Sequence, residues 1–169
     1  MRKRGKLLVL SIIILALIIG VFLIRAFSAK QLDDVSPEIL CSQELLEKAD
    51  VLYIIPAYYH QNISENQEWC QSIIALNKKL ALHGVYHTPK EFSIDRNTEY
   101  LQQGIREFEN CFNQTPEKFK SPQLATSKSN KKLIKNNNLK LEGLFNQVFH
   151  KVYHCDDKGE FPNWLIDLF

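Results

Sequence analysis

The sequence predicts an α/β domain with a mainly parallel sheet, carried behind one N-terminal transmembrane helix. From residue 29 onward, segments typical of strands alternate with segments typical of helices, and polar motifs follow the strands. An unbroken apolar run near the N-terminus predicts the transmembrane helix. Hydrophobic residues make up 45% of the 169 residues, so a core remains possible once that run is set aside.

The N-terminal residues divide into a basic segment, 1–6, and an apolar segment, 7–25. Within the apolar segment up to residue 24, only Ser11 and Gly20 lack an apolar side chain. The run is close to the roughly 17–25 residues that span a bilayer. Because basic clusters stay in the cytoplasm, residues 29–169 are expected to be exported, to the periplasm or the cell exterior.

A cleaved signal peptide is the alternative for the same segment. Residues 26–28 (Ala-Phe-Ser) have small side chains at the spacing for cleavage before Ala29. The apolar core of a signal peptide is usually about 7–15 residues, which is shorter than this run. The length therefore favours an uncleaved anchor, and both alternatives export the domain.

Charge and cysteine content limit the partners and the chemistry. A formal net charge of +2 is too small to indicate nucleic-acid binding. Four cysteines follow the apolar run, and an oxidising compartment would allow two disulfides with three possible pairings, or leave buried free thiols. Their spacing contains no Cys-x-x-Cys, which argues against a zinc site built from cysteines. They are Cys41, Cys70, Cys111 and Cys155.

The first strand and helix of the exported part lie around two adjacent aspartates. A short strand at residues 31–32 leads into Asp33 and Asp34. Ser36 at the N-cap and Pro37 at the first helical position predict a helix that continues to about residue 48.

The next elements repeat this order. Residues 51–55 form an apolar stretch that ends at Pro56, which predicts a buried strand. Ser64 caps a helix expected over residues 65–78. The apolar residues 80–82 predict a short strand that leads directly into a histidine motif.

The second half of the chain continues the alternation. Asn97 or Thr98 opens a helix through residue 112, and residues 119–120 form a short strand. Ser127 opens a further helix. Two more strands are predicted after it, at residues 139–141 and 148–153.

Polar or turn motifs follow four of the predicted strands. In a parallel sheet the carboxyl ends of the strands meet at one edge, where binding sites gather. The four motifs are therefore expected to form a single site. They are Asp33-Asp34 and residues 56–59, 83–87 and 120–122.

One carboxylate and two imidazoles form the ligand set of an open divalent metal site, and a second carboxylate is then free to act on water. Asp33, Asp34, His83 and His87 supply such a set. The two histidines lie either on one face of a helical turn or, as Gly84 indicates, on a loop that ends a strand. Adjacent aspartates also cap helices, so Asp34 could instead accept backbone N–H groups.

Four motifs in this order resemble the polysaccharide deacetylase (NodB-homology) superfamily, closest to an uncharacterised bacterial branch with Asp-Asp-Val-Ser-Pro and His-Gly-x-x-His signatures. The resemblance covers about residues 31–143. It implies a distorted (β/α) barrel, complete or incomplete, with a divalent metal, usually zinc, at the strand carboxyl ends. The motifs are residues 32–37 (Leu-Asp-Asp-Val-Ser-Pro), 53–56 (Tyr-Ile-Ile-Pro), 80–87 (Leu-Ala-Leu-His-Gly-Val-Tyr-His) and 91–92 (Glu-Phe).

The same resemblance implies a role for each matching residue. Asp34, His83 and His87 correspond to the metal ligands, and Asp33 corresponds to the catalytic base. The family uses a late histidine as the general acid. His150 and His154, which alternate onto one face of the strand predicted at 148–153, are the candidates, and His154 is preferred.

Further residues are expected to contact a sugar. Lys120 and Pro122 fall where the family carries an Arg-x-Pro motif, and Lys is a point donor that cannot clamp a carboxylate with two hydrogen bonds. Tyr58, Tyr59 and Tyr86 are placed to stack on a pyranose face or to pack between loops.

The resemblance implies a membrane-anchored, metal-dependent hydrolase that removes acetyl groups from N-acetylated envelope or cell-wall glycans. Lys120, the ill-defined late motif and the shortness of residues 29–169 for a complete barrel favour a second hypothesis. In that hypothesis the chain is a non-catalytic, membrane-tethered glycan-binding or scaffold protein. A structural domain with a chance pattern is the third.

Overall fold

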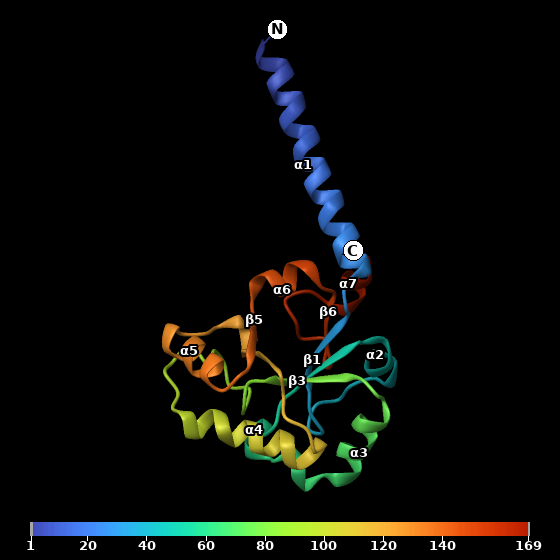
Figure 1. Cartoon of the computed structure of the whole chain (residues 1–169). Coiled ribbons are helices and arrows are strands. Elements are labelled where there is room, and N and C mark those ends of the chain that lie inside the picture. The colour runs from blue at the N-terminus through green and yellow to red at the C-terminus, as the bar shows by residue number, and fades with distance from the viewer. Residues whose placement is uncertain (1, 169) are drawn as a thin grey trace.

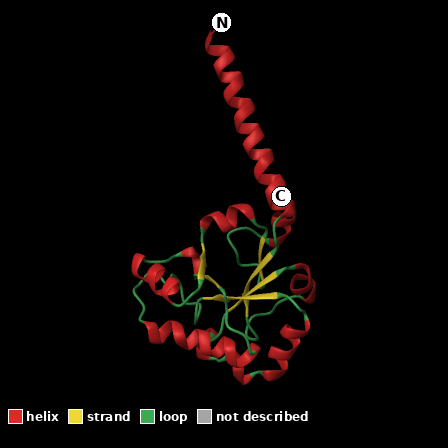
Figure 2. Ribbon diagram, in the orientation of Figure 1, coloured by secondary structure: helices red, strands yellow, loops and turns green. Residues whose placement is uncertain are grey.

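The computed structural model describes residues 2–168, with side chains described from residue 6 onward. One long helix, α1 (Arg2–Phe27), projects from an α/β domain, and the N-terminus lies at its far end (Figure 1). Figure 2 shows the strands gathered at the centre of the domain with helices around them. Chain order and layers therefore match the α/β class predicted from the sequence.

The sheet contains six parallel strands, β1 to β6, in the order β5-β4-β3-β2-β1-β6. It curls into a half-barrel that remains open between its edge strands, β5 and β6. This arrangement confirms the distorted and incomplete (β/α) barrel. The strands are β1 (Gln31–Val35), β2 (Val51–Ile54), β3 (Lys79–His83), β4 (Lys118–Lys120), β5 (Lys140–Glu142) and β6 (Val152–His154).

The remaining elements connect these strands and cover the outside of the sheet. The α-helices are α2 (Gln43–Lys48), α3 (Gln67–Ala75), α4 (Thr98–Phe112), α5 (Lys128–Asn136), α6 (Leu144–Phe149) and α7 (Asn163–Leu168). Three short 3-10 helices are η1 (Tyr58–His60), η2 (Ile63–Glu65) and η3 (Pro122–Leu124).

Two helices begin where the sequence predicts. Asn97 accepts a hydrogen bond from the Tyr100 N–H and caps α4, and Ser127 accepts one from the Asn130 N–H and caps α5. Each cap satisfies a backbone donor that would otherwise lack a partner. The caps therefore set the orientation of two helices that pack against the sheet.

Two predicted helix starts are wrong. Residues 36–42 form a turn and a loop, and α2 begins only at Gln43, because Ser42 rather than Ser36 accepts the capping hydrogen bond from Leu45 N. Asn66, not Ser64, caps α3. The Ser64 hydroxyl instead donates to Glu107 on α4.

The strand predicted over residues 148–153 is also wrong in its first half. Val148 lies in α6, whose last carbonyls are held by Arg25 of α1: its guanidinium donates to Gln147 O and Val148 O, both at 3.0 Å. Only residues 152–154 join the sheet, as β6. His150 therefore lies outside the strand, half-buried, with its ring Nδ1 3.0 Å from Ala29 O.

All four cysteines are paired, so the alternative of free thiols is wrong. Cys41 pairs with Cys155, and Cys70 pairs with Cys111. The first bridge ties the loop before α2 to the residue after β6, and the second joins α3 to α4. The first bridge therefore fixes the position of the late histidine motif.

Within the described residues, α1 is the one helix long and apolar enough to cross a membrane. Its apolar part, Lys6–Phe27, has a mean hydropathy of 3.4, and none of the residues in its most apolar stretch is buried. A signal sequence would have the same properties. The anchor and its topology therefore remain predictions.

Candidate metal centre

The motifs that follow the predicted strands meet at one edge of the half-barrel. Asp33 and Asp34 lie on β1, His83 ends β3, and Lys120 ends β4. Strand register places His83 beside Lys120 and Asp33 beside His154. The structure thus brings residues from four strands into one site.

Asp34, His83 and His87 form a compact ligand cluster. Asp34 Oδ1 lies 2.8 Å from His87 Nε2 and 3.3 Å from His83 Nε2, and the three potential ligand atoms all lie within 4.8 Å of one another. Ligands of one zinc ion, each bonded at roughly 2.0–2.2 Å, require separations of this size. The predicted ligand set therefore fits a single ion by distance.

Hydrogen bonding fixes which nitrogen of His83 faces the cluster. Nδ1 lies 3.1 Å from Lys120 O, a carbonyl that can only accept, so this nitrogen carries the proton and donates it. Nε2 of a neutral ring then presents its lone pair toward Asp34. Metal-ligating histidines are commonly oriented in this way by a backbone carbonyl.

Asp34 Oδ1 is buried and accepts no well-aligned hydrogen bond from any described residue, despite the short distances to both imidazoles. A buried carboxylate oxygen facing two ring nitrogens requires a cation or an added proton between them. A divalent ion satisfies that requirement with neutral rings. The buried oxygen without a hydrogen-bond donor is the observation that best supports metal binding by these residues.

The charges in the cluster also shift two pKa values. Burial alone would raise the pKa of Asp34, but the interactions with His83 and His87 outweigh burial and hold it well below its usual range. Burial alone would lower the pKa of His83, but Asp33 and Asp34 outweigh that effect and raise it.

Asp33 lies next to the cluster in a buried polar network. Lys120 Nζ is 2.7 Å from Asp33 Oδ1 and 2.8 Å from Gln31 Oε1, and it lies 3.8 Å from the centre of the Tyr53 ring. Asn146 of α6 exchanges two hydrogen bonds with Gln31. Lys120 is thus part of the support for Asp33.

The burial of Lys120 changes the expectation for this residue. Its side chain is completely buried, and burial lowers its pKa although Asp33 partly offsets the effect. The ammonium group points at Asp33 and Gln31 rather than at open solvent. This geometry favours a role in orienting Asp33 over the direct sugar contact predicted from the sequence.

His154 faces the second oxygen of Asp33. Its Nε2 lies 3.9 Å from Asp33 Oδ2, while its Nδ1 is buried without a partner among the described residues. Asn163 exchanges two hydrogen bonds with the His154 backbone, and Gly159 lies so close to the ring that a side chain at 159 would collide with it. Of the two predicted candidates for the general acid, only His154 lies in this site.

Glu91 organises the loop that carries His87. Its carboxylate accepts hydrogen bonds from the backbone N–H groups of Val85, Tyr86 and His87, at 2.8–3.2 Å, and from the Tyr100 hydroxyl at 2.5 Å. The sequence motif included Glu91 but indicated no role for it. The role depends on a loop conformation that residue types alone do not reveal.

Gly84 explains how the loop reaches this conformation. Its φ of 68° is in the region that favours glycine, and a side chain there would collide with Glu91 and Pro122. The histidine pair is therefore on a loop that ends a strand, not on a helical turn. Pro122 is buried against Gly84 of this loop, which leaves little of its side chain free for the sugar contact predicted from the sequence.

The three predicted aromatic residues differ in position. Tyr58 lies beside the cluster, with its ring centre 6.2 Å from that of His87, and Tyr59 next to it is 76% exposed. Tyr86 packs against His60 and Tyr100, with ring centres 4.3 and 5.5 Å away. Tyr59 is thus more accessible to a ligand than Tyr58 and Tyr86, which are both half-buried.

No protein-family model and no curated protein matches the chain. Solved structures do match it. A family 4 carbohydrate esterase from Streptomyces lividans in complex with acetate has a TM-score of 0.52 at 14% identity, and the polysaccharide deacetylase Bc1974 from Bacillus cereus has a TM-score of 0.52 at 15%. A mutant of BA3943, a CE4 family pseudoenzyme, has a TM-score of 0.50 at 13%.

The chain has the polysaccharide deacetylase fold. The matches cover 67%, 68% and 67% of this chain and 60%, 58% and 42% of the three structures. The chain thus spans about two-fifths to three-fifths of their length. At these identities the similarity establishes the fold, and the resemblance inferred from the sequence motifs is confirmed at that level.

In this deacetylase fold, the candidate ligands line a cavity of about 830 Å³. Asp33, Asp34, His83, His87 and His154 all contribute to its wall. Residues of the loop after β6, of α6 and of the last turns of α1 line it as well. The predicted base, ligands and acid therefore share one cavity.

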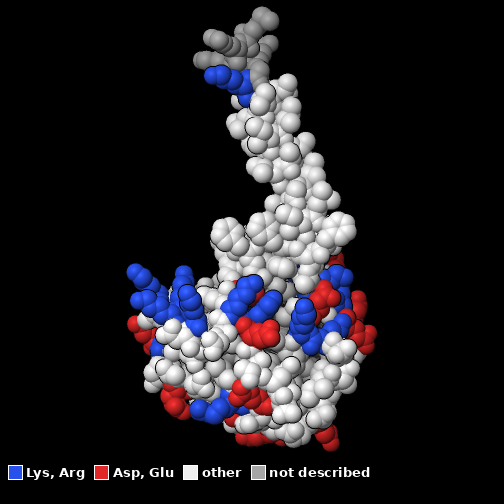
Figure 3. Space-filling model, viewed as in Figure 1, with Lys and Arg blue, Asp and Glu red and all other residues white. Residues whose placement is uncertain are grey.

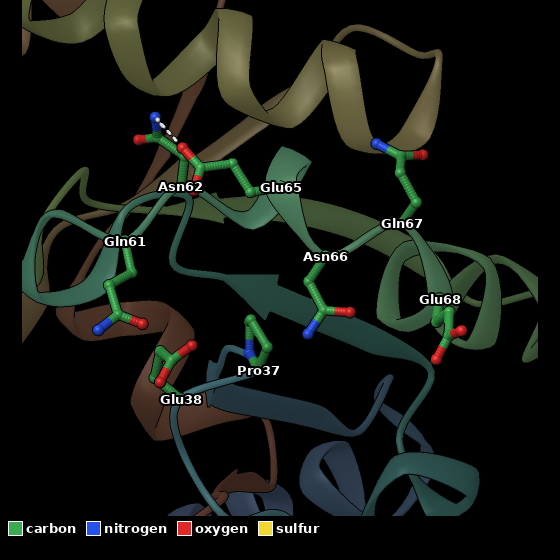
Figure 4. A pocket seen from close by; sticks show the side chains of 8 residues that line it. All are labelled: Pro37, Glu38, Gln61, Asn62, Glu65, Asn66, Gln67 and Glu68. Atoms are coloured by element: carbon green, nitrogen blue, oxygen red, sulfur yellow. Dashed lines mark hydrogen bonds between the residues drawn. The ribbon is translucent and has the colours of Figure 1, made fainter.

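A second hollow, of about 520 Å³, lies elsewhere in the domain (Figure 4). Its side chains come from the loop after β1 and from the segment that includes η2 and the start of α3. They are polar or acidic apart from Pro37, and Asn62 donates to Glu65 at 3.4 Å. None of these lining residues belongs to the candidate metal centre.

Proposed function

We propose that the chain is an exported, membrane-anchored, metal-dependent hydrolase that removes acetyl groups from N-acetylated envelope or cell-wall glycans. The observation that carries the proposal is the cluster of Asp34, His83 and His87 with the carboxylate of Asp33 beside it. The cluster lies at the carboxyl edge of a deacetylase-type half-barrel, where such folds carry their sites. The cavity at that edge, which the proposed ligands and base help to line, supports the same function.

Asp34, His83 and His87 would hold the metal, and their mixed oxygen and nitrogen donors suit zinc among the divalent ions. When bound, such an ion supplies Lewis-acid chemistry: it polarises an amide carbonyl and acidifies a water molecule. Glu91 and the Lys120 carbonyl orient His87 and His83 for this task.

Asp33 would accept the proton of the attacking water. Its Oδ1 is engaged by Lys120 at 2.7 Å, which leaves Oδ2 on the side of His154 as the basic atom. Lys120 compensates the charge of the buried carboxylate and fixes its orientation. A positioned base of this kind typically contributes about 10²–10⁴-fold in rate.

His154 would protonate the leaving amine. Its Nε2 lies on the Asp33 side of the cavity, and the backbone of β6 is fixed by Asn163 and by the disulfide at Cys155. The proposed base and acid are thus neighbours in one cavity. Tyr58, whose ring centre is 6.2 Å from that of His87, and its exposed neighbour Tyr59 would contact a sugar ring that extends beyond the cavity.

Metal analysis of the purified full-length chain, combined with hydrolysis of soluble N-acetylglucosamine oligosaccharides, tests the proposal. We expect one divalent ion per chain, lost in His83→Ala but retained in Asp33→Asn, and turnover lost in both. His60→Ala, an exposed histidine near the site, is the matched control and should keep both properties. Absence of a divalent ion bound by Asp34, His83 and His87 in the unmodified chain would overturn the proposal.

Non-catalytic glycan binding is the second candidate function. It is favoured by the buried Lys120 in place of an arginine and by the description of BA3943 as a pseudoenzyme. Oligosaccharide binding without acetate release, in a chain that retains its metal, would support it over hydrolysis.

A further inference from the structure

The cavity that contains the candidate metal ligands is also lined by α1. Val21, Phe22 and Arg25 of this helix share the cavity wall with Asp34 and the two histidines. These three residues precede the helix end, Phe27, by two to six positions, or about 3–9 Å at a rise of about 1.5 Å per residue. The cavity therefore reaches the exported end of the apolar helix.

The dimensions of α1 place this part of the cavity at a bilayer surface. The apolar part, Lys6–Phe27, contains 22 residues and is about 33 Å long, close to the roughly 30 Å of a hydrocarbon core. Val21 and Phe22 would then lie at the boundary between acyl chains and headgroups. Arg25 joins this end of α1 to α6 through two backbone carbonyls.

Apolar side chains surround the same region. Leu144, Val148 and Phe161 line the cavity and are 70%, 40% and 53% exposed. Figure 3 shows an uncharged surface at the base of α1 that is continuous with the helix, with charged side chains beginning farther away. Soluble monomers rarely expose apolar surface of this kind, whereas membrane interfaces accept it. Four more exposed side chains, Phe27, Phe145, Trp164 and Leu168, lie on α1, α6 and α7.

One cavity thus combines an apolar wall with a polar site of carboxylates and imidazoles. Such a cavity suits an amphipathic ligand, with its polar headgroup at the histidines and its tail along α1. We propose that the substrate is the N-acetylated sugar headgroup of a membrane lipid, presented from the bilayer beside α1. This inference rests on the proposed hydrolase function and specifies its substrate class.

The test compares two substrates with the full-length chain in phospholipid vesicles. One is N-acetylglucosamine joined through phosphate to a polyprenyl chain, and the other is a soluble N-acetylglucosamine oligosaccharide. We expect kcat/KM for the lipid-linked sugar to be higher by about tenfold or more, because burying one large apolar group is worth about that factor. Equal or lower values would overturn this inference and leave the hydrolase function standing. Absence of turnover on both would overturn the function and the inference together.

Two variants connect the preference to the apolar wall. Leu144→Gln and Phe161→Gln should each lower the ratio of lipid-linked to soluble turnover several-fold to tenfold. Leu40→Gln is the matched control, since Leu40 is 90% exposed and lies outside the cavity lining. An equal loss in the control would overturn the assignment of the wall.

Binding supplies a readout that does not depend on turnover. In the Asp33→Asn chain, a fluorescent lipid-linked N-acetylglucosamine in the vesicles should be retained and should resist competition by the soluble oligosaccharide. Leu144→Gln in the same background should weaken retention by a similar factor. Retention that is unaffected by Leu144→Gln, or abolished by the soluble sugar, would overturn the proposal.

Discussion

Two adjacent carboxylates reach the same site because β1 is irregular. In a regular strand, successive side chains point to opposite faces. The pairing of β1 with β2 shifts register between Leu32 and Val35, and Asp34 has a φ of 64°. The bulge lets Asp33 contact Lys120 while Asp34 turns toward His87. The sequence reveals the pair of aspartates but not the bulge, because the bulge arises from pairing with a neighbouring strand.

At the residue scale, the Asp33–Lys120 pair gives a stability prediction. Lys120→Met should lower the free energy of unfolding by about 3–5 kcal/mol, because it leaves Asp33 buried beside no cation. The double variant with Asp33→Asn should recover most of that loss. Urea unfolding of the metal-free chain measures both. The exposed pair Arg106–Glu99 is the control and should show a coupling of about 1 kcal/mol or less. Additive effects at Asp33 and Lys120 would contradict the prediction.

At the element scale, features that depend on nearby residues could be predicted from the sequence, whereas features that depend on tertiary contacts could not. The helix caps at Asn97 and Ser127 could be predicted because the capping side chain and its backbone partner are three residues apart. The end of α6 was predicted as a strand, because Val148 begins an alternation that continues through His150 and Val152. Arg25, more than 100 residues away, holds the last carbonyls of this helix, and the local sequence does not reveal that contact. The ligand pattern at the strand ends was predictable, whereas the supporting roles of Glu91, Gln31 and Asn146 depend on contacts formed only in the fold.

The loop between β3 and α4 provides a prediction about metal affinity. Glu91→Gln replaces one acceptor oxygen with a donor, so at least one of the backbone N–H groups of residues 85–87 loses its partner. We expect metal affinity to fall about 10–100-fold, as for other groups that orient ligands, with the fold retained. Titration of the metal-free chain with zinc, with circular dichroism to check the fold, measures the effect. Glu109→Gln on α4 is the control, and an equal loss there would refute the role of Glu91.

The helix α7 provides a pH prediction. Asp167 bonds Lys48 and the Tyr153 hydroxyl, and these contacts outweigh burial and lower its pKa. A lowered pKa means that the stabilisation is complete above the unfolded value, about 3.9, and disappears as the pH falls through the folded value. Amide protection of α7, corrected for intrinsic exchange rates, should therefore decrease below about pH 4. The Asp167→Asn chain should lack this dependence, and an unchanged dependence in that variant would exclude Asp167 as its source.

At the scale of the whole molecule, the half-barrel and α1 form one structural unit. The sheet is open between β5 and β6, and α6, which follows β5 directly, packs against the end of α1. Val21 and Phe22 contribute to the wall of the cavity that contains the candidate ligands. The sequence indicated an anchor and a domain, but not this shared cavity, because no local pattern relates residues 21–25 to residues 144–161.

Removal of residues 1–28 by cleavage before Ala29 would also remove three cavity-lining residues and both hydrogen bonds from Arg25 to α6. We therefore expect α1 to remain in the mature protein. After expression in a bacterial host, the chain should stay in the membrane fraction through alkaline carbonate washing, and intact mass should include residues 1–28. Residues 29–169 behind an unrelated cleavable signal peptide are the control and should be released. A mature N-terminus at Ala29 in the unmodified chain would contradict the anchor and the cavity wall that depends on it.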